Sequence, residues 1–113
     1  MKRGEIRYAN LNPVVGSEIA KRRPALIISN DANNRAASTV TILPITSNVS
    51  RIYPFEVFLG AGESGLEKDS KIQAQQVRTL SKERFSGLPT GNLDADKMRL
   101  VEAALSLHLG LPT

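Results

Sequence analysis

The most constraining feature of the sequence is the short apolar run at residues 25–29 together with the charged segment before it. The run is uninterrupted and too short for a helix, and its adjacent isoleucines favour a buried β-strand. Pro24 stands at its start, where a strand tolerates a residue that cannot donate a hydrogen bond. One carboxylate and three cations precede that proline: Glu18, Lys21, Arg22 and Arg23. Because loops held by rigid strands often carry function, this junction is the first candidate site.

The counts of a few residue types exclude several kinds of site. A chain of 113 residues predicts one domain, residues 1–113, with a single modest core. Without cysteine the chain can hold neither a disulfide nor a thiolate zinc site, and it has no thiol nucleophile. Its one histidine, His108, excludes a zinc site of two imidazoles and the histidine-pair mechanism of some ribonucleases. We therefore expect no metal and no cofactor.

Charge and hydropathy narrow the class of partner. The net charge of +4 permits binding to a polyanion such as nucleic acid, although ordinary surface charge explains it equally. The N-terminus has charge but no apolar signal-peptide core, and no apolar segment reaches the length of a membrane span. These features, with the absence of cysteine, favour a soluble cytoplasmic protein that has no membrane partner.

Alternation and turn residues predict five strands, at residues 3–11, 25–29, 39–45, 55–59 and 71–80. Pro44 within the third of them favours an edge strand or a bulge. In the fourth strand we expect Phe55, Val57 and Leu59 to face inward and Glu56 and Phe58 to face outward. The fifth strand changes face between Ala74 and Val77, which predicts a bulge.

The segments between the strands have turn composition. Residues 32–38 and 60–69 are expected to be loops, residues 81–85 a short helical turn, and Gly87-Leu88-Pro89 a break. Asp94 begins the clearest helix as its N-cap, with Leu93 and Met98 as a hydrophobic staple, and Gly110 ends it. The helix has a wide apolar stripe, explained equally by partner contact and by a deeper core. Five short strands and one terminal helix predict a mainly β, partly closed barrel with helical cover.

Segments along nearly the whole chain resemble the MazF/PemK toxins of bacterial toxin–antitoxin systems. They are R-G-E-I-R-Y-A-N-L-N-P at 3–13, G-S-E at 16–18, R-P-A-L-I-I-S-N-D at 23–31, P-I-T-S at 44–47, Y-P-F-E-V at 53–57, Q-V-R-T-L at 76–80 and the final A-L-S-L-H-L-G-L. The resemblance implies a small, Src-homology-3-like, partly open barrel of the CcdB/PemK/MazF type that forms a homodimer. It implies metal-independent cleavage of single-stranded RNA (mRNA) that leaves 2′,3′-cyclic phosphate and 5′-hydroxyl ends and inhibits translation and growth. It also implies a cognate MazE-like antitoxin whose acidic tail occupies the RNA groove.

The same resemblance implies catalysis by Arg23 and Thr46, with Glu18 implicated in some members. The chemistry fits, since a guanidinium grips two phosphate oxygens at once and a threonine hydroxyl donates to a non-bridging oxygen. Glu18 is the only nearby carboxylate that could accept the proton of the RNA 2′-hydroxyl. The structural alternatives are an arginine that snorkels at a strand end, a threonine that merely ends a strand, and a solvated glutamate paired with Lys21 or Arg22.

Further RNA contacts are expected from polar side chains near these motifs: Ser17, Lys21, Arg22, Ser47, Asn48, Gln76 and Arg78. Tyr53 and Phe58 are candidate stacking faces for bases, although an outward Phe58 fits a subunit interface equally. Strand-end capping explains Ser47 and Asn48 as well. His108 is interpreted as a packed or interface residue. The loop departs from the family, which usually has a glutamine after G-S-E and a glycine nearby where this chain has Ile19, Ala20 and Lys21.

Two other functions share some of these features. A CcdB-like toxin would poison a protein such as DNA gyrase through its C-terminal helix and would not need Arg23. A non-catalytic RNA- or antitoxin-binding barrel would bind RNA with an affinity that weakens with salt, but would not cleave it.

Overall fold

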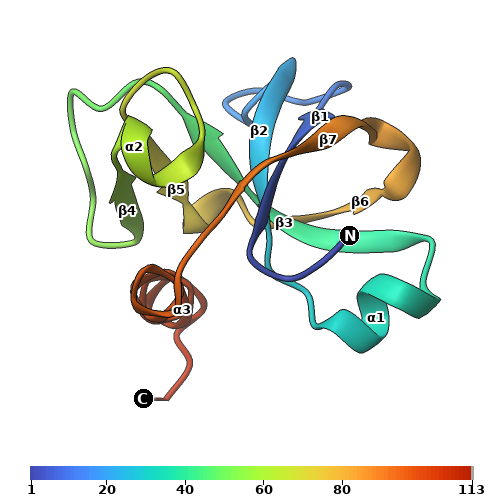
Figure 1. Ribbon diagram of the computed structural model, residues 1–113. Coiled ribbons are helices and arrows are strands. Elements are labelled where there is room, and N and C mark those ends of the chain that lie inside the picture. Colours follow the sequence, from blue (N-terminus) through green and yellow to red (C-terminus); the bar gives the residue numbers. More distant parts are fainter. Residues whose placement is uncertain (113) are drawn as a thin grey trace.

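The computed structural model describes residues 1–112, and its sheet is built around the strand β3 (Thr39–Thr46). On one side β3 pairs with β2 (Arg22–Ile27), and on the other it pairs first with β6 (Arg78–Ser81) and then with β5 (Ser70–Gln73). β1 (Glu5–Asn10) and β7 (Phe85–Asn92) extend the sheet beyond β2, and β4 (Glu56–Leu59) extends it beyond β5. All pairs are antiparallel. Figure 1 shows the sheet coiled but partly open, which confirms the mainly β class with a C-terminal helix.

Pro44 lies in the central strand of this sheet, so the expected edge or bulge is wrong. Its cross-strand partner on β2 is Ala25. On the other side, Ile42 is the last residue that pairs with β6 and Ile45 is the first that pairs with β5. Proline is tolerated here because its missing N–H falls between two partner strands, where no ladder hydrogen bond is required.

Two hydrophobic clusters lie on opposite faces of β2 and β3, because successive strand residues alternate in direction. One contains Ala9, Leu11, Ala25, Ile27, Val40, Ile42 and Leu80. The other contains Ile6, Leu26, Leu43, Ile45, Val57, Leu59, Ile72, Ala74, Met98, Val101 and Ala104. A strand that is buried on both faces has apolar residues at consecutive positions, which is why the segment at 25–29 does not alternate between apolar and polar residues.

The C-terminal helix α3 (Ala95–Leu109) covers the second cluster beneath β4 and β5, as Figure 1 shows. The predicted caps are confirmed, since Asp94 Oδ1 accepts from Lys97 N at 2.8 Å and Gly110 closes the helix in the left-handed conformation. Only Met98, Val101 and Ala104 of the apolar stripe are buried. Large side chains farther round the helix are exposed, including Leu100 and Leu107 at 55% and 57%.

Two segments expected to be loops contain short helices. α1 (Asp31–Ala36) begins at the N-cap Asn30, whose side chain accepts from Asn33 N, and it is fixed by the buried Asn34, which donates to Ser29 O at 2.8 Å. α2 (Ala61–Ser64) lies within the expected loop 60–69. Both are shorter than two turns and lack an apolar stripe, so polar capping and tertiary contacts rather than periodicity determine them.

The second half of the sheet also differs from the prediction. The expected strand 71–80 is two strands, β5 and β6, separated by the 3-10 turn η1 (Ala74–Gln76) in place of a bulge. The helical turn expected at 81–85 is confirmed as η2 (Lys82–Arg84). β7 runs through the expected break at Gly87-Leu88-Pro89 and pairs with β1. Glu56, expected to face outward, is buried, whereas Phe58 is exposed as predicted. Within residues 1–112, no helix is both long and apolar enough to span a bilayer.

Candidate active site

Arg23 and Thr46 lie at the ends of β2 and β3 that adjoin in the sheet. The pairing of the two strands reaches Ala25 opposite Pro44, and Arg23 precedes Ala25 by two residues whereas Thr46 follows Pro44 by two. Because side chains alternate along a strand, those of Arg23 and Thr46 belong to the same face of the sheet. Arg23 is paired with Ala9 of β1, and Thr46 is paired with Lys71 of β5. Two motifs distant in sequence therefore share one face at one end of the sheet.

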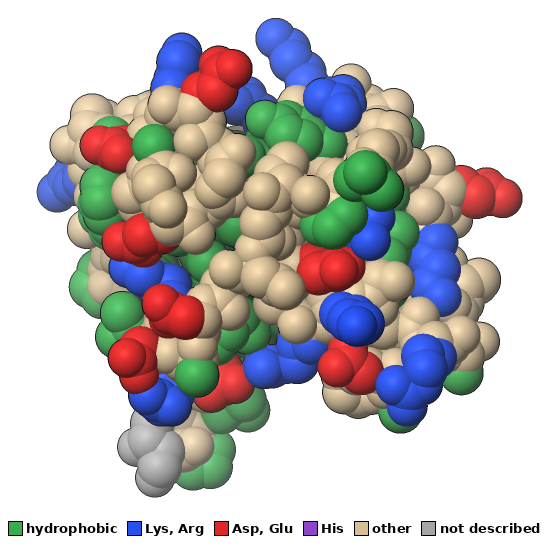
Figure 2. All heavy atoms as spheres, in the orientation of Figure 1, with side chains coloured by type: hydrophobic (Ala, Val, Ile, Leu, Met, Phe, Trp, Pro, Cys, Tyr) green, Lys and Arg blue, Asp and Glu red, His purple; other side chains and the backbone are tan. Residues whose placement is uncertain are grey.

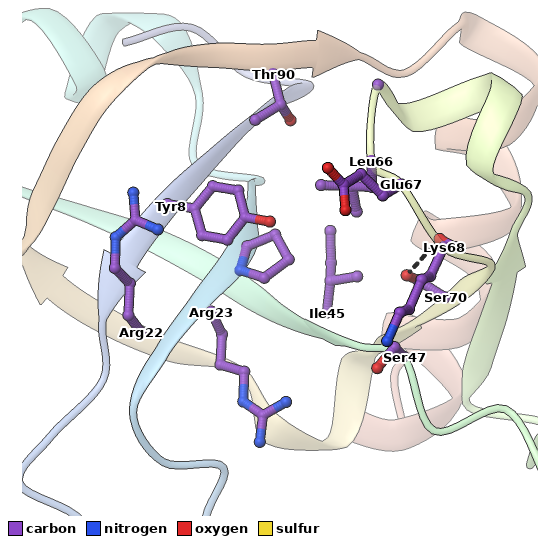
Figure 3. Close-up of a pocket in the computed structure, with 12 residues that line it drawn as sticks. Tyr8, Arg22, Arg23, Ile45, Ser47, Leu66, Glu67, Lys68, Ser70 and Thr90 are labelled. Carbon is purple, nitrogen blue, oxygen red and sulfur yellow. Dashed lines mark hydrogen bonds between the residues drawn. The ribbon is translucent and has the colours of Figure 1, made fainter.

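A cavity of about 540 Å³ opens beside these strand ends. Its walls come from β1, β2, β3, β7 and the segment that leads into β5: Tyr8, Arg22, Arg23, Pro24, Ile45, Ser47, Gly65, Leu66, Glu67, Lys68, Ser70 and Thr90. Figure 3 shows Tyr8 pointing across the cavity toward Leu66 and Glu67, whereas Arg22 lies behind the Tyr8 ring and Arg23 extends away from that segment. An apolar floor with cations, hydroxyls and one carboxylate around it is typical of small-ligand sites.

Arg23 is half-buried at the border of this cavity. Its Nε donates to the carbonyl of Ala20 at 3.1 Å, which fixes the side chain against the preceding loop. The two terminal guanidinium nitrogens make no hydrogen bond within residues 1–112, so their four N–H groups remain for an anion. The neighbouring Arg22 lies with its guanidinium 4.3 Å from the centre of the Tyr8 ring and contacts Ser86 Oγ at 3.4 Å.

Thr46 ends β3 and is buried, and it does not line the cavity, although Ile45 and Ser47 on either side of it do. Its Oγ1 accepts from Asn48 N at 3.3 Å, which leaves the hydroxyl hydrogen free to donate. Ser47 and Asn48 are exposed, and Asn48 Oδ1 accepts from the Ser50 hydroxyl at 2.8 Å. Ser47 and Asn48 can therefore cap the end of β3 and still contact a phosphate.

The loop between β1 and β2 holds the remaining candidates outside the cavity. Glu18 is exposed, and its Oε1 accepts from Val15 N at 2.5 Å, a contact within the loop itself. Lys21 has a positive φ of 72° and its N–H donates to Asn12 Oδ1 at 3.1 Å. Ser17 is exposed. The carboxylate thus has to leave its Val15 contact before it can serve as a base.

Gln76 and Arg78 each hydrogen-bond the backbone of the loop between β1 and β2. Gln76 Oε1 accepts from Ile19 N at 3.4 Å, and Arg78 donates to Leu11 O at 3.0 Å. Of the residues expected to bind RNA, Arg22 and Ser47 line the cavity with Arg23, whereas Ser17, Lys21, Asn48, Gln76 and Arg78 do not.

The candidate stacking residues Tyr53 and Phe58 do not line the cavity. Tyr53 and Phe58 are each 41% exposed, but one face of Tyr53 is covered by Phe55, with ring centres 5.5 Å apart. His108 is exposed and its ring lies 6.3 Å from that of Phe55, so it is an edge residue of an aromatic cluster rather than a core residue. The distribution of charge is mixed, as Figure 2 shows for one face, where acidic side chains are denser over α2 and α3 and basic side chains are denser on the opposite side.

Several cavity residues were not identified from the sequence, namely Tyr8, Leu66, Glu67, Lys68, Ser70 and Thr90. The segment from Gly65 to Ser70 has the arrangement already seen before β2, a glycine followed by charged residues at the start of a buried strand. The same pattern of a glycine and charged residues before a buried strand therefore indicates Glu67 and Lys68 as site residues. Within residues 1–112 no three side chains of histidine, cysteine, aspartate or glutamate are grouped to hold a metal ion.

Comparisons with known proteins agree with this fold. Residues 2–109 match the family described as PemK-like, MazF-like toxin of type II toxin–antitoxin systems. The chain is 41% identical over 116 residues to endoribonuclease MazF9 of Mycobacterium tuberculosis (strain ATCC 25618 / H37Rv), and the match covers 98% of each chain. The crystal structure of MazF (Form-I) from Deinococcus radiodurans superposes with a TM-score of 0.85 at 29% identity and covers 98% of this chain and 97% of its own.

An endoribonuclease solved in complex with its cognate antitoxin, from a mycobacterial species, has a TM-score of 0.81 at 27% identity, covering 100% of this chain and 98% of that one. The family match spans nearly all of the residues that build the sheet, the cavity and α3. On these grounds, the chain belongs to the PemK-like, MazF-like toxin family of type II toxin–antitoxin systems.

Proposed function

We propose that this protein is an endoribonuclease toxin that cleaves single-stranded RNA through attack by the RNA's own 2′-hydroxyl. Two observations support the proposal. The chain is 41% identical, nearly end to end, to a relative named as an endoribonuclease. In addition, alternation along β2 and β3 favours an Arg23 guanidinium and a Thr46 hydroxyl on one face of the sheet, and Arg23 borders a cavity. The proposed mechanism rests on the second observation.

In the proposed reaction the O2′–P bond forms while the P–O5′ bond breaks. Arg23 binds two phosphate oxygens with the N–H groups that are free of protein partners, and Thr46 donates to a non-bridging oxygen as charge develops. Glu18 accepts the 2′-hydroxyl proton after its contact with Val15 opens, and the leaving 5′ oxygen takes up a proton from water. The products are a 2′,3′-cyclic phosphate and a 5′-hydroxyl. A single donor of this kind is worth about 2.7–4 kcal/mol of barrier in other enzymes.

The cavity is the proposed place for the nucleotide next to the scissile phosphate. Tyr8 provides an aromatic wall, Pro24 and Ile45 provide an apolar floor, and Arg22 and Lys68 add positive charge at the rim. Bases of single-stranded RNA are commonly bound by such a combination of stacking and cations. The remaining proposed RNA contacts are Ser17, Lys21, Ser47, Asn48, Gln76 and Arg78.

Two protein partners belong to the proposal. A second copy of the chain is expected, because α3 leaves Leu100, Leu107 and Leu109 half exposed beside the exposed Phe58. A cognate MazE-like antitoxin is expected because a structural relative was solved with its antitoxin, and an acidic tail would compete with RNA for Arg22 and Arg23. Sedimentation and co-expression with the neighbouring open reading frame test these two expectations.

The decisive experiment incubates the protein with long single-stranded RNA in a chelator and maps the fragment ends. Thr46→Val and Arg23→Met should each lower kcat/KM by at least about 100-fold, because each removes a donor to the transition state. Thr79→Val and Arg99→Met are matched controls, since among residues 1–112 the Thr79 hydroxyl is hydrogen-bonded to Thr41 alone and the Arg99 guanidinium to Asp96 alone. Intact RNA, or ends without cyclic phosphate, would refute the nuclease. Inhibition of gyrase supercoiling, or RNA binding without turnover, would then identify the alternative.

A further inference from the structure

A buried charged network lies beside Thr46, formed by Glu56, Lys71, Gln73 and Gln75. The Glu56 side chain is 1% exposed and the Lys71 side chain 9%, and Lys71 Nζ donates to Glu56 Oε1 at 2.9 Å. Glu56 Oε2 accepts from Gln75 at 2.6 Å and from Gln73 at 3.3 Å. Hydrogen-bond donors therefore surround the Glu56 carboxylate. Because these donors come from another part of the sequence, no short stretch of the sequence predicts the network.

Stability does not explain this network. Desolvation of two charges offsets most of their attraction, and a hydrophobic pair of similar volume often stabilises a fold equally well or better. The side-chain oxygens of Gln73 and Gln75 are buried and make no hydrogen bond within residues 1–112, which adds a further cost. Costly arrangements of this kind concentrate where a fold supports function.

The position of the network relates it to the proposed catalytic row. Lys71 pairs with Thr46 across β3 and β5, and Phe58 pairs with Lys71 across β4 and β5. Phe58, Lys71 and Thr46 thus occupy successive strands in one row, and Arg23 shares their face by alternation, so the Lys71 side chain lies on the same face as the proposed catalytic pair.

The network also holds the segment that follows Thr46. Lys71 Nζ donates to the carbonyl of Arg51 at 2.7 Å, and Glu56 Oε1 accepts from Tyr53 N at 3.0 Å. Residues 47–53 leave β3 at Thr46 and return at β4, so one ion pair fixes the far end of this connection at two backbone positions. The near end carries Ser47 and Asn48 and the hydrogen bond between Asn48 N and Thr46 Oγ1.

We propose that Lys71 and Glu56 are positioning residues for RNA cleavage, which act by holding residues 47–53 so that the Thr46 hydroxyl is aimed at the scissile phosphate. The inference rests on the proposed nuclease function. It requires no contact between the ion pair and RNA. A displacement of about 1 Å in a reacting group costs roughly 100-fold in rate, so loss of this support lowers kcat much more than it weakens RNA binding.

The test removes both charges together, because Lys71→Met alone leaves a buried carboxylate without its partner. The double variant Glu56→Gln/Lys71→Met keeps side-chain volume and an acceptor for Tyr53 N. We expect a kcat lower by about 10- to 100-fold, with the Kd for an RNA carrying a 2′-deoxy substitution at the scissile nucleotide within about threefold of the wild type. Lys71→Arg retains the charge and donor groups and should recover most of the lost kcat.

The matched control is Arg3→Met/Glu102→Gln. Arg3 likewise joins a backbone carbonyl, that of Ile28 at 3.0 Å, to a carboxylate, that of Glu102 at 2.9 Å, but this pair is exposed. It should leave kcat unchanged. If the double variant does not fold by circular dichroism, Glu56→Gln/Lys71→Gln, which also removes both charges, replaces it with the same expectation. Wild-type kcat in a folded variant, or an equal loss of RNA affinity and kcat, overturns the positioning role while leaving the nuclease intact. No cleavage by the wild-type protein refutes the proposed function itself.

Discussion

A close contact between α2 and β7 determines the shape of the cavity wall, and replacing Gly65 tests it. Gly65 ends α2 with φ of 72°, and a Cβ at this position would overlap the carbonyl oxygen of Thr90 and come within 3.0 Å of its carbon. The contact is reciprocal, since a Cβ at Gly91 would overlap the carbonyl oxygen of Ser64 and come within 2.9 Å of its carbon. Backbone lies against backbone, so no flexible side chain can move aside.

The expected cost of Gly65→Ala has two parts. An alanine in the left-handed region costs about 1–2 kcal/mol, and overpacking against a rigid neighbour costs about 1–3 kcal/mol more. The free energy of unfolding should therefore fall by about 2–5 kcal/mol. Gly87 isolates the first part, because its φ is 79° but a Cβ there meets nothing within 4 Å. Gly91 isolates the second part, because a Cβ there overlaps Ser64 without a positive φ.

Urea unfolding followed by circular dichroism measures the three variants. All three replace glycine by alanine, so the change in unfolded-chain entropy is common to them and cancels in the comparison. The expected order of destabilisation is Gly65→Ala first, with Gly87→Ala and Gly91→Ala each accounting for part of the loss. Equal losses for Gly65→Ala and Gly87→Ala would refute the close approach of α2 to β7. A Gly91→Ala protein that remains folded should also cleave RNA more slowly, because Gly65 and Thr90 both line the cavity.

Three further measurements test the electrostatics and the loop. Burial by itself raises the pKa of Glu56, but the Tyr53 N–H and three side-chain donors outweigh it and hold the pKa below its ordinary value of 4.5. The resulting stability is present above that value and is lost as the pH falls through the lower pKa of the folded state, so the advantage of the wild type over Glu56→Gln in urea stability should shrink as the pH falls below 4.5. Lys21 adopts φ of 72°, so Lys21→Gly should be more stable than Lys21→Ala by about 1 kcal/mol in thermal unfolding, since both lose the charge. Arg22→Met should reduce the slope of log affinity against log salt for single-stranded RNA by about 0.7, whereas Arg35→Met on α1 should leave the slope unchanged.

The sequence predicted best those elements whose burial is local in origin. The strands at 25–29 and 39–45 and the capped helix α3 have apolar patterns or caps that lie within a few residues of one another. β7 has neither, because most of its residues are exposed and its hydrogen bonds come from β1, far away in the chain. α1 depends on Asn34 reaching back to Ser29, a contact that periodicity does not reveal.

The site was predictable where residue type and motif coincided, and not where burial depended on a distant partner. Alternation assigned Glu56 to the surface because a carboxylate is costly to bury alone. Its burial becomes favourable only with Lys71, which approaches from the next strand of the sheet. The same limit applies to Lys68, whose position beside the cavity follows from the contact between α2 and β7 rather than from its neighbours in sequence.

The exchange of partners at Pro44 links the sheet to the chemistry. Thr41 points its N–H and C=O toward β2. By alternation the backbone nitrogen of Pro44, which carries no hydrogen, faces the other side of β3. On that side β5 takes over from β6 as the pairing strand. Pro44 has no N–H to donate at that position, and β5 begins its pairing one residue later at Ile45. The next residue, Thr46, is therefore opposed to Lys71 and not to a residue of β6. Pro44 would weaken a central strand elsewhere, but here it lies where the pairing of β3 with β6 ends and the pairing with β5 begins. The pairing with β5 brings the charged network of Lys71 and Glu56 next to the proposed catalytic hydroxyl of Thr46.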